Sequence, residues 1–423
     1  MSNYRRHKGR KPSQKSALTP ARKLAVEITA QARERDAYVR ELIDARRAEN
    51  TLPTEEFAYA QVLSFGVTMC RGTLDFFIDK NLNKPSDIKA NVRDCLRISG
   101  YELLFLGKPD HVVVSQGVEM VRSVAPKAAG LANAVLRRMA ADAPQFPWPQ
   151  IGSGLASFAR LYGVPEWLAS ELIVQHKRKV AAEVLSACLD PAPTYVVENP
   201  YAPGTTFVSD LSAQQSASMV PVDGSILEIG AGRGTKTMLL QRRAKLECGW
   251  SANIHTVDIH PYKEQLLSER LAANKVPDVT THTGDACHLD EIKGLPSAFD
   301  AVFVDAPCSG TGTLRRHPEI RWKLTKEDLY GLAALQLRML KEAAGCVRPG
   351  GALVYSTCSI LKQENQEVVE AFLASDEGAL FSVEPATPAF PEFEGSVTEE
   401  GYFASLPTAA GPDGHFCAIL RRV

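Results

Sequence analysis

The pattern of apolar and polar positions divides the chain into a helical part and an alternating part. From Pro20 to about Met139 the pattern is helical; apolar residues at 114, 118, 121 and 125, for example, have the spacing of one buried helix face. From Phe207 onward, apolar runs of strand length alternate with helical patterns, which is typical of a parallel sheet covered by helices. The sequence therefore predicts an all-α domain followed by an α/β domain.

The alternating part predicts a Rossmann-like, seven-stranded and mostly parallel sheet. The expected strands are 225–230, 253–259, 279–284, 299–305, 352–357, a weak strand near 402–406, and a hairpin-like return at 415–421, with a long amphipathic helix over about 326–346. Before this part, residues 141–205 hold a proline-rich connector and two helical patterns, around 165–176 and 181–189. The expected division is a basic flexible tail (1–18), a helical domain (19–140), a linking subdomain (141–205) and the α/β domain (206–423).

Composition and charge narrow the possible classes of protein. The 423 residues are 45% hydrophobic, and none of their apolar runs approaches the roughly 18 residues of a membrane span. The nine cysteines are odd in number and scattered, which argues against a disulfide framework and against zinc, so we expect no metal and a cytoplasmic protein. Residues 1–18 carry six Lys/Arg and no acid, as expected of an arm attracted to polyanions or of a solubilising tail.

A glycine-rich turn follows the first strand of the alternating part. In ILEIGAGRGTKT (226–237), the glycines alternate as G-x-G-x-G, the pattern of S-adenosylmethionine sites and not of dinucleotide sites. Asp258 and Asp285 end the next two strands, where they would meet the ribose and the adenine, although each could also cap a turn. The predicted cofactor residues are Glu228, Gly230, Ala231, Gly232, Arg233, Gly234, Lys236, Asp258, Asp285 and Asp305.

Two cysteines follow two strands at the edge where such sheets bind ligands. Cys308 comes three residues after Asp305, and Cys358 follows the next predicted strand. Methylation of cytosine at C5 needs such groups: a thiolate that adds to C6, an acid near N3, and a base that later removes the C5 proton. The alternative is that both cysteines are merely buried at strand ends.

These motifs resemble a known family. DAPCSGTGTLRRHPEIRW (305–322) and YSTCSILKQEN (355–365) are similar to the active-site motifs of RNA 5-methylcytosine methyltransferases. Residues 97–121 and 130–139 resemble the NusB-like RNA-binding domain of the bacterial RsmB and Sun type, so the similarity spans nearly the whole chain. It implies S-adenosylmethionine as cofactor, small-subunit ribosomal RNA as substrate, Cys358 as nucleophile, Cys308 as the residue that assists release, and Asp305 facing N3.

The chain departs from the family pattern at two places. Arg233 stands where relatives have proline, and Val197-Glu198-Asn199 stands where they have Arg-x-Asn. These departures keep an alternative open, a non-catalytic RNA-binding or assembly factor that uses the NusB-like domain. A monomer is expected in either case.

Basic residues near the motifs are candidates for RNA contact. Arg315, Arg316, Arg321 and Trp322 form a basic and partly aromatic segment beside the expected site, suited to phosphate contact and base stacking or to fixing the loop. Arg137 and Arg138, near a helix end, could contact RNA or cap carbonyl groups.

Overall fold

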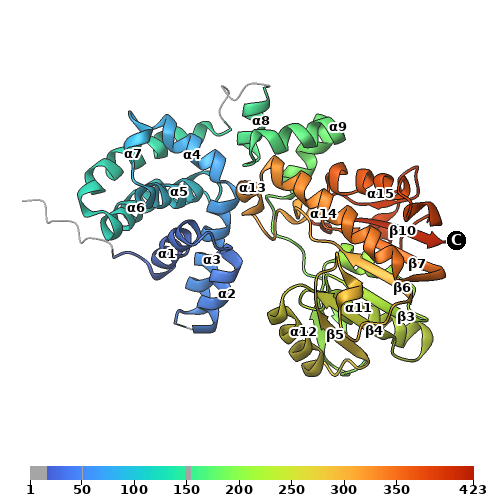
Figure 1. Ribbon diagram of the computed structural model, residues 1–423. Helices are drawn as coiled ribbons and strands as arrows, with labels where there is room; N and C mark the ends of the chain where they lie inside the picture. The colour runs from blue at the N-terminus through green and yellow to red at the C-terminus, as the bar shows by residue number, and fades with distance from the viewer. Residues whose placement is uncertain (1–16, 50, 148–153) are drawn as a thin grey trace, which may run out of the picture. The chain divides into compact units, whose positions relative to one another are not determined.

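The protein consists of two compact units in the computed structural model, residues 1–163 and 164–423 (Figure 1). The structure describes residues 17–49, 51–147 and 154–423. The boundary falls inside the predicted linking subdomain 141–205, so the first part of that segment belongs to the first unit and the rest to the second. The predicted tail 1–18 lies almost entirely outside the described residues.

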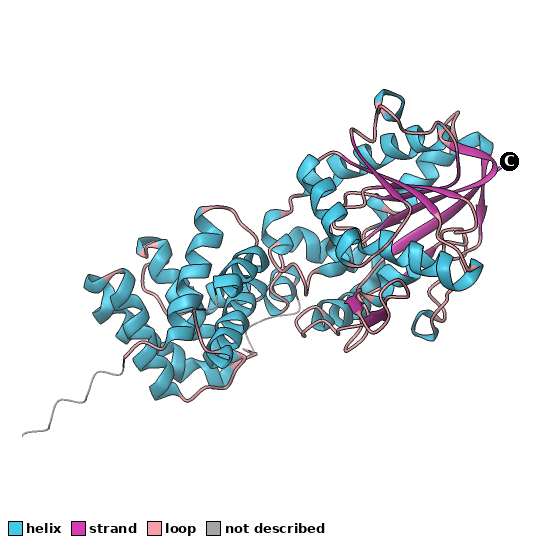
Figure 2. Cartoon of the chain, turned by 90° about the horizontal axis from the view of Figure 1, so that it is seen from below, coloured by secondary structure: helices cyan, strands magenta, loops and turns pink. Residues whose placement is uncertain are grey.

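The described part of the first unit is all-helical, as predicted, with only short 3-10 turns besides (Figure 2). Its α-helices are α1 (Pro20–Glu34), α2 (Val39–Glu49), α3 (Thr54–Met69), α4 (Arg71–Lys80), α5 (Ala90–Leu104), α6 (Asp110–Val124), α7 (Ala129–Asp142) and α8 (Leu155–Leu161). α5 lies at the centre and contacts α1, α3, α4, α6 and α7. This arrangement buries one face of each surrounding helix.

The buried face of α6 differs from the predicted one. The expected positions were 114, 118, 121 and 125, but the helix buries Val113, Gln116, Gly117, Met120 and Val121. Valine occupies 112, 113 and 114, so the apolar pattern does not select one face. Gln116 decides it, because its side chain donates to the carbonyl of Ala17 and accepts from the amide of Thr19, both at 3.0 Å.

The second unit begins with α9 (Glu166–Ala187), which has a kink at Lys177, where φ is 67°. The kink lies between the two helical patterns that the sequence predicts. A short hairpin, β1 (Val196–Glu198) and β2 (Thr206–Val208), follows and was not predicted. After α10 (Leu211–Ser218), strands and helices alternate as expected.

The large sheet of this unit has the order β5-β4-β3-β6-β7-β10-β8, with β9 paired to β10. Its strands are β3 (Ser225–Ile229), β4 (Asn253–Asp258), β5 (Val279–Thr283), β6 (Phe299–Asp305), β7 (Val347–Thr357), β8 (Phe381–Glu384), β9 (Phe403–Ala404) and β10 (Phe416–Arg422). The first five in the row are parallel, and β10 is antiparallel to β7 and β8. The seventh strand of the row is β8, which the sequence did not predict, and the predicted strand 402–406 is the two-residue β9.

Helices cover both faces of the sheet (Figure 1). α10, α11 (Thr235–Arg243) and α12 (Pro261–Ala273) contribute to one core, and α14 (Lys326–Gly345) and α15 (Gln366–Leu373) to the other. The carboxyl ends of β3 to β7 meet at one edge, and the amino end of the antiparallel β10 joins them there. Within the described residues, no helix is long and apolar enough to cross a membrane.

Candidate active site

The glycine-rich turn after β3 brings two strand ends into close contact. Gly230 has a φ of 85°, and a Cβ at this position would collide with the carbonyl oxygen of Asp305 at the end of β6. Gly234, with a φ of 76°, precedes the first residue of α11. Glycine is therefore required where the chain leaves β3, and the amides of α11 begin directly beside the sheet edge.

A cavity of 290 Å³ opens at this edge, beside the turn. Its lining includes Gly230, Asp258, Asp285 and Asp305, together with the apolar Leu335 and Met339 of α14. Asp258 accepts from the amide of His260 (3.1 Å) and Asp285 from the amide of Cys287 (2.9 Å), so each also caps its own turn. The turn-capping role of these aspartates is therefore observed, and their contact with a cofactor stays a prediction.

The other predicted cofactor residues are not part of the lining of this cavity. These are Glu228, Ala231, Gly232, Arg233, Gly234 and Lys236. Arg233 is exposed, and its carbonyl accepts from Arg270 at 2.9 Å. The departure from the family pattern at Arg233 thus falls on the outside of the turn.

Glu228 is a buried carboxylate without a partner. It is 0% exposed, and neither oxygen has a hydrogen-bond partner among the described residues. Burial raises the pKa of Glu228 to about 7. An orphaned acid behind the glycine turn, two aspartates at the next strand ends and an apolar wall fit a ligand with an amino group, a ribose and an aromatic base.

The two predicted cysteines are brought together across β6 and β7. Their Sγ atoms lie 3.1 Å apart, and the amide of Cys358 points to the Sγ of Cys308 at 3.3 Å. Both side chains are partly buried. The hydrogen bond with Cys358 and burial raise the pKa of Cys308 well above its usual value, so Cys308 is a neutral thiol at neutral pH.

Lys236 and Asp305 form an ion pair beside the thiols. Burial opposes the charge of Lys236, but the Asp305 carboxylate outweighs burial and raises the pKa of Lys236. The ammonium group also lies 5.7 Å from the centre of the Phe303 ring. The pair therefore keeps Lys236 protonated beside the Asp305 carboxylate, which lines the cavity.

The basic segment after Cys308 is folded into the protein. Arg315 binds Asp413 and the carbonyl of Gly411, and Arg321 is 0% exposed and donates to the carbonyls of Leu314 and Cys188 at 2.8 and 2.9 Å. In this structure these two guanidinium groups hold loops together and are not accessible to phosphate. A basic residue beside a motif indicates RNA contact only if its side chain is exposed, which the sequence does not reveal.

The remaining candidates for RNA contact are more accessible. Arg316, partly exposed, pairs with Asp210 and Asp413, and Trp322 is partly buried in α13 (Ile320–Lys323). Arg137 and Arg138 are exposed on α7 but precede its last turn, which contains no basic residue, so they do not cap it. Their contact with RNA stays a prediction.

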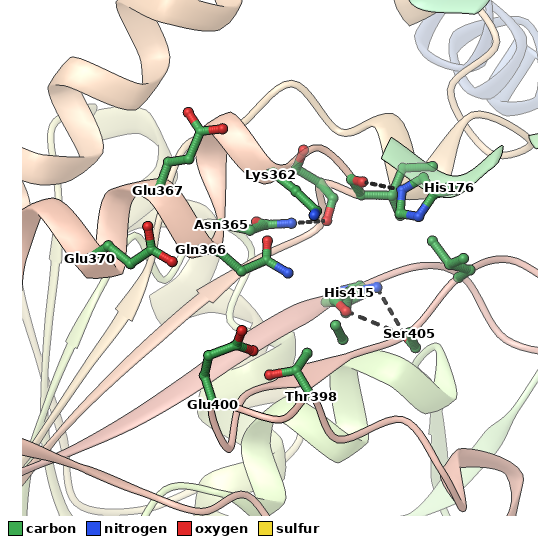
Figure 3. A pocket seen from close by; sticks show the side chains of 14 residues that line it. His176, Lys362, Asn365, Gln366, Glu367, Glu370, Thr398, Glu400, Ser405 and His415 are labelled. Atoms are coloured by element: carbon green, nitrogen blue, oxygen red, sulfur yellow. Dashed lines mark hydrogen bonds between the residues drawn. The ribbon is translucent and has the colours of Figure 1, made fainter. Parts of the chain in front are cut away.

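A second cavity, of 570 Å³, lies beside the segment that follows Cys358 (Figure 3). Ser359, Ile360 and Asn365 contribute to its lining, and Glu367, Glu370 and Glu400 give it an acidic character. Among the described residues, no group of three or more His, Cys, Asp or Glu side chains could hold a metal ion, here or elsewhere.

Two residues of the site, Glu364 and Asn365, were not assigned from the sequence. Both are buried between the loops that carry the cysteines. They belong to the motif YSTCSILKQEN (355–365), so membership of the motif was the available signal.

Known proteins are similar to this chain in sequence and in fold. Residues 218–421 match the family described as 16S rRNA methyltransferase RsmB/F, and residues 19–141 match the NusB family. A Thermus thermophilus protein named Ribosomal RNA small subunit methyltransferase B is 32% identical, over 96% of this chain and 98% of its own length. A Bacillus subtilis protein named Probable ribosomal RNA small subunit methyltransferase B is 26% identical, over 96% and 99%. The solved structure of PH0851 has the same fold, with a TM-score of 0.72, 19% identity and coverage of 96% and 99%.

The chain belongs to the RsmB/F family of 16S rRNA methyltransferases. The resemblance inferred from its motifs is thereby confirmed, as are the NusB domain and the α/β methyltransferase fold. As a member of the RsmB/F family it is an RNA methyltransferase that uses S-adenosylmethionine.

Proposed function

We propose that the protein methylates C5 of a cytosine in RNA, with small-subunit ribosomal RNA as the substrate, through a covalent bond between Cys358 and C6. The observation that carries this proposal is the 3.1 Å separation of the Cys308 and Cys358 Sγ atoms beside the Lys236–Asp305 pair. Direct transfer to C5 would need one acid or base, whereas two thiols in contact suit addition followed by elimination.

The residues of the site divide the reaction among them. The Cys358 thiolate adds to C6, which forms an S–C6 bond and makes C5 nucleophilic, while the Lys236–Asp305 pair faces N3 and the Lys236 ammonium stabilises the negative charge that develops there. Gly230, Asp258 and Asp285 would hold S-adenosylmethionine, which would supply the methyl group. Loss of the C5 proton to water then restores the C5–C6 double bond, the S–C6 electron pair returns to Cys358 as a thiolate, and the neutral Cys308 thiol assists this release by donating a hydrogen bond to the leaving sulfur. The target base reaches the thiols by flipping out of its stack.

The test is covalent capture of RNA. A Cys308→Ala variant, incubated with S-adenosylmethionine and 16S rRNA, should accumulate a protein–RNA adduct that survives denaturation, because release is slowed. A Cys358→Ala variant should form no adduct. Cys346→Ala, which changes a partly buried thiol outside the site, should behave as the unaltered protein.

The alternative, a non-catalytic RNA-binding or assembly factor, makes the opposite prediction. A protein of that kind would bind RNA through the NusB-like domain and would form no covalent adduct with RNA in any variant. Absence of an adduct from folded, cofactor-bound Cys308→Ala protein would favour that alternative and reject the covalent mechanism.

A further inference from the structure

We propose that Glu364 and Asn365 are positioning residues, each of which holds one of the two cysteines through the residues on both sides of it, Asn365 directly and Glu364 partly through Gln336. The proposal rests on the proposed function, and it assigns a separate residue to the positioning of each thiol. Both side chains are buried, at 0% and 4% exposure.

Glu364 holds the segment around Cys308. Its carboxylate accepts from the amide of Ser309 at 2.7 Å and from the Ser309 hydroxyl. The amide of Gln336 donates to the same carboxylate at 3.1 Å and to the carbonyl of Pro307 at 2.9 Å. The residues before and after Cys308 are therefore both connected to Glu364, one through Gln336 and one directly.

Asn365 holds the segment around Cys358 in the same way. Its side-chain oxygen accepts from the Thr357 hydroxyl at 2.6 Å, and its nitrogen donates to the carbonyl of Ser359 at 2.9 Å, the bond drawn from Asn365 in Figure 3. The residues before and after Cys358 are thus both bonded to Asn365. Because Glu364 and Asn365 are adjacent, one short segment determines the positions of both thiols.

The chemistry of the two side chains suits these tasks. Donors from Ser309 and Gln336 converge on both side-chain oxygens of Glu364. Only a carboxylate can accept hydrogen bonds on both of its oxygens. Asn365 must accept from a hydroxyl and donate to a carbonyl, which only an amide does in that geometry. The charge of Glu364 also helps to raise the pKa of Cys308, after the hydrogen bond between the two thiols, burial and the charge interaction with Cys358.

Isosteric exchanges separate the two roles. Glu364→Gln places an amide among three donors and should loosen the Cys308 loop, whereas Asn365→Asp places a carboxylate against the Ser359 carbonyl and should displace Cys358. Glu367→Gln, an exposed change three residues further along, is the matched control. Gln336→Met removes the Gln336 contacts without altering the carboxylate and provides a second test if Glu364→Gln does not fold.

The expected result is a split between two steps of single-turnover kinetics with RNA and S-adenosylmethionine. Glu364→Gln and Gln336→Met should form adduct normally and release it more slowly, by a factor on the order of 10 to 100. Asn365→Asp should form adduct more slowly by a similar factor. The idea is overturned if both exchanges slow the same step, as general loosening would, or if Glu364→Gln behaves as Glu367→Gln.

A second readout needs no turnover. In a Cys358→Ala background, alkylation of Cys308 by iodoacetamide, located by mass spectrometry, should reach half its maximal rate at a lower pH when Glu364 is replaced by Gln. An unchanged midpoint would contradict the proposal. If the Cys308→Ala protein forms no adduct at all, the covalent mechanism fails, while this alkylation shift still decides the role of Glu364.

Discussion

The Sγ atoms of Cys308 and Cys358 lie 3.1 Å apart, although 50 residues separate them in the chain. The contact makes one thiol the hydrogen-bond partner of the other, which is the largest cause of the raised pKa of Cys308. The neutral form of Cys308 should therefore persist to a higher pH while Cys358 is present than when Cys358 is removed.

Cys358→Ala should accordingly lower the pKa of Cys308. The pH at which Cys308 becomes reactive to iodoacetamide should fall, because the thiol loses its partner and the nearby sulfur that disfavours its negative charge. Cys346, whose pKa burial raises to about 11, is an internal control and should react with the same pH profile in both proteins. A profile for Cys308 that does not change would contradict the coupling.

The buried Glu228 predicts a stability that depends on pH. Its pKa in the folded protein is raised to about 7, so folding favours the protonated form, and the stability of the ligand-free protein should fall as pH rises from about 4.5 to 7. Glu228→Gln removes this penalty and should increase the free energy of unfolding at pH 8 by up to about 3 kcal/mol. Urea unfolding of both proteins at pH 5 and pH 8 measures this free energy. If the free energies of unfolding of the two proteins differ by the same amount at both pH values, the prediction is refuted. The same variant should bind S-adenosylmethionine more weakly.

Gly230→Ala tests the close approach of β3 and β6. The added Cβ would collide with the carbonyl of Asp305, so we expect loss of cofactor binding and a reduction of the free energy of unfolding by about 2 kcal/mol or more. Gly249→Ala is the matched control, because its φ of 84° is nearly the same and its Cβ meets no described atom within 4 Å. That control should lose only about 1 kcal/mol. Similar losses in both variants would show that backbone strain alone matters.

Arg321→Met should destabilise the protein without changing its contact with RNA. Two buried carbonyls, of Leu314 and Cys188, would lose their donor, at a cost of about 2–4 kcal/mol in the free energy of unfolding. The salt dependence of RNA binding by the folded variant should be unchanged. Arg338→Met, at an exposed position of α14, should leave the free energy of unfolding unchanged. A smaller salt dependence of RNA binding in Arg321→Met would instead support the phosphate contact that the sequence suggested for Arg321.

The pair Arg137 and Arg138 should behave in the opposite way. Both are exposed on α7, so the double alanine variant should unfold as the unaltered protein does. If both side chains contact phosphates, the slope of log affinity against log salt should decrease by about two. Fluorescence anisotropy with labelled rRNA fragments measures the slope. An unchanged slope would exclude these residues from the interface.

The local pattern of apolar residues, glycine and proline was sufficient to predict much of the fold and part of the site. The helical first unit, the strands β3 to β7 and the kinked α9 follow from apolar periodicity and from glycine and proline positions. β8 was missed because four residues carry too little periodicity. The face of α6 was predicted only in part: Val121 is buried as expected, but three successive valines fit either face, and the contacts of Gln116 with Ala17 and Thr19 accompany burial of the neighbouring face.

The sequence by itself determined the motifs, and with them the family and the residues Asp305, Cys308 and Cys358. Only the tertiary structure decided how these groups act on one another. Parallel pairing of β6 with β7 brings the two thiols into contact. The side chains of Arg315 and Arg321 are buried. Glu364 and Asn365 are buried against the loops that carry the cysteines. The physical reason is that hydrogen bonds, burial and charge interactions depend on distances in space, which spacing along the chain does not specify.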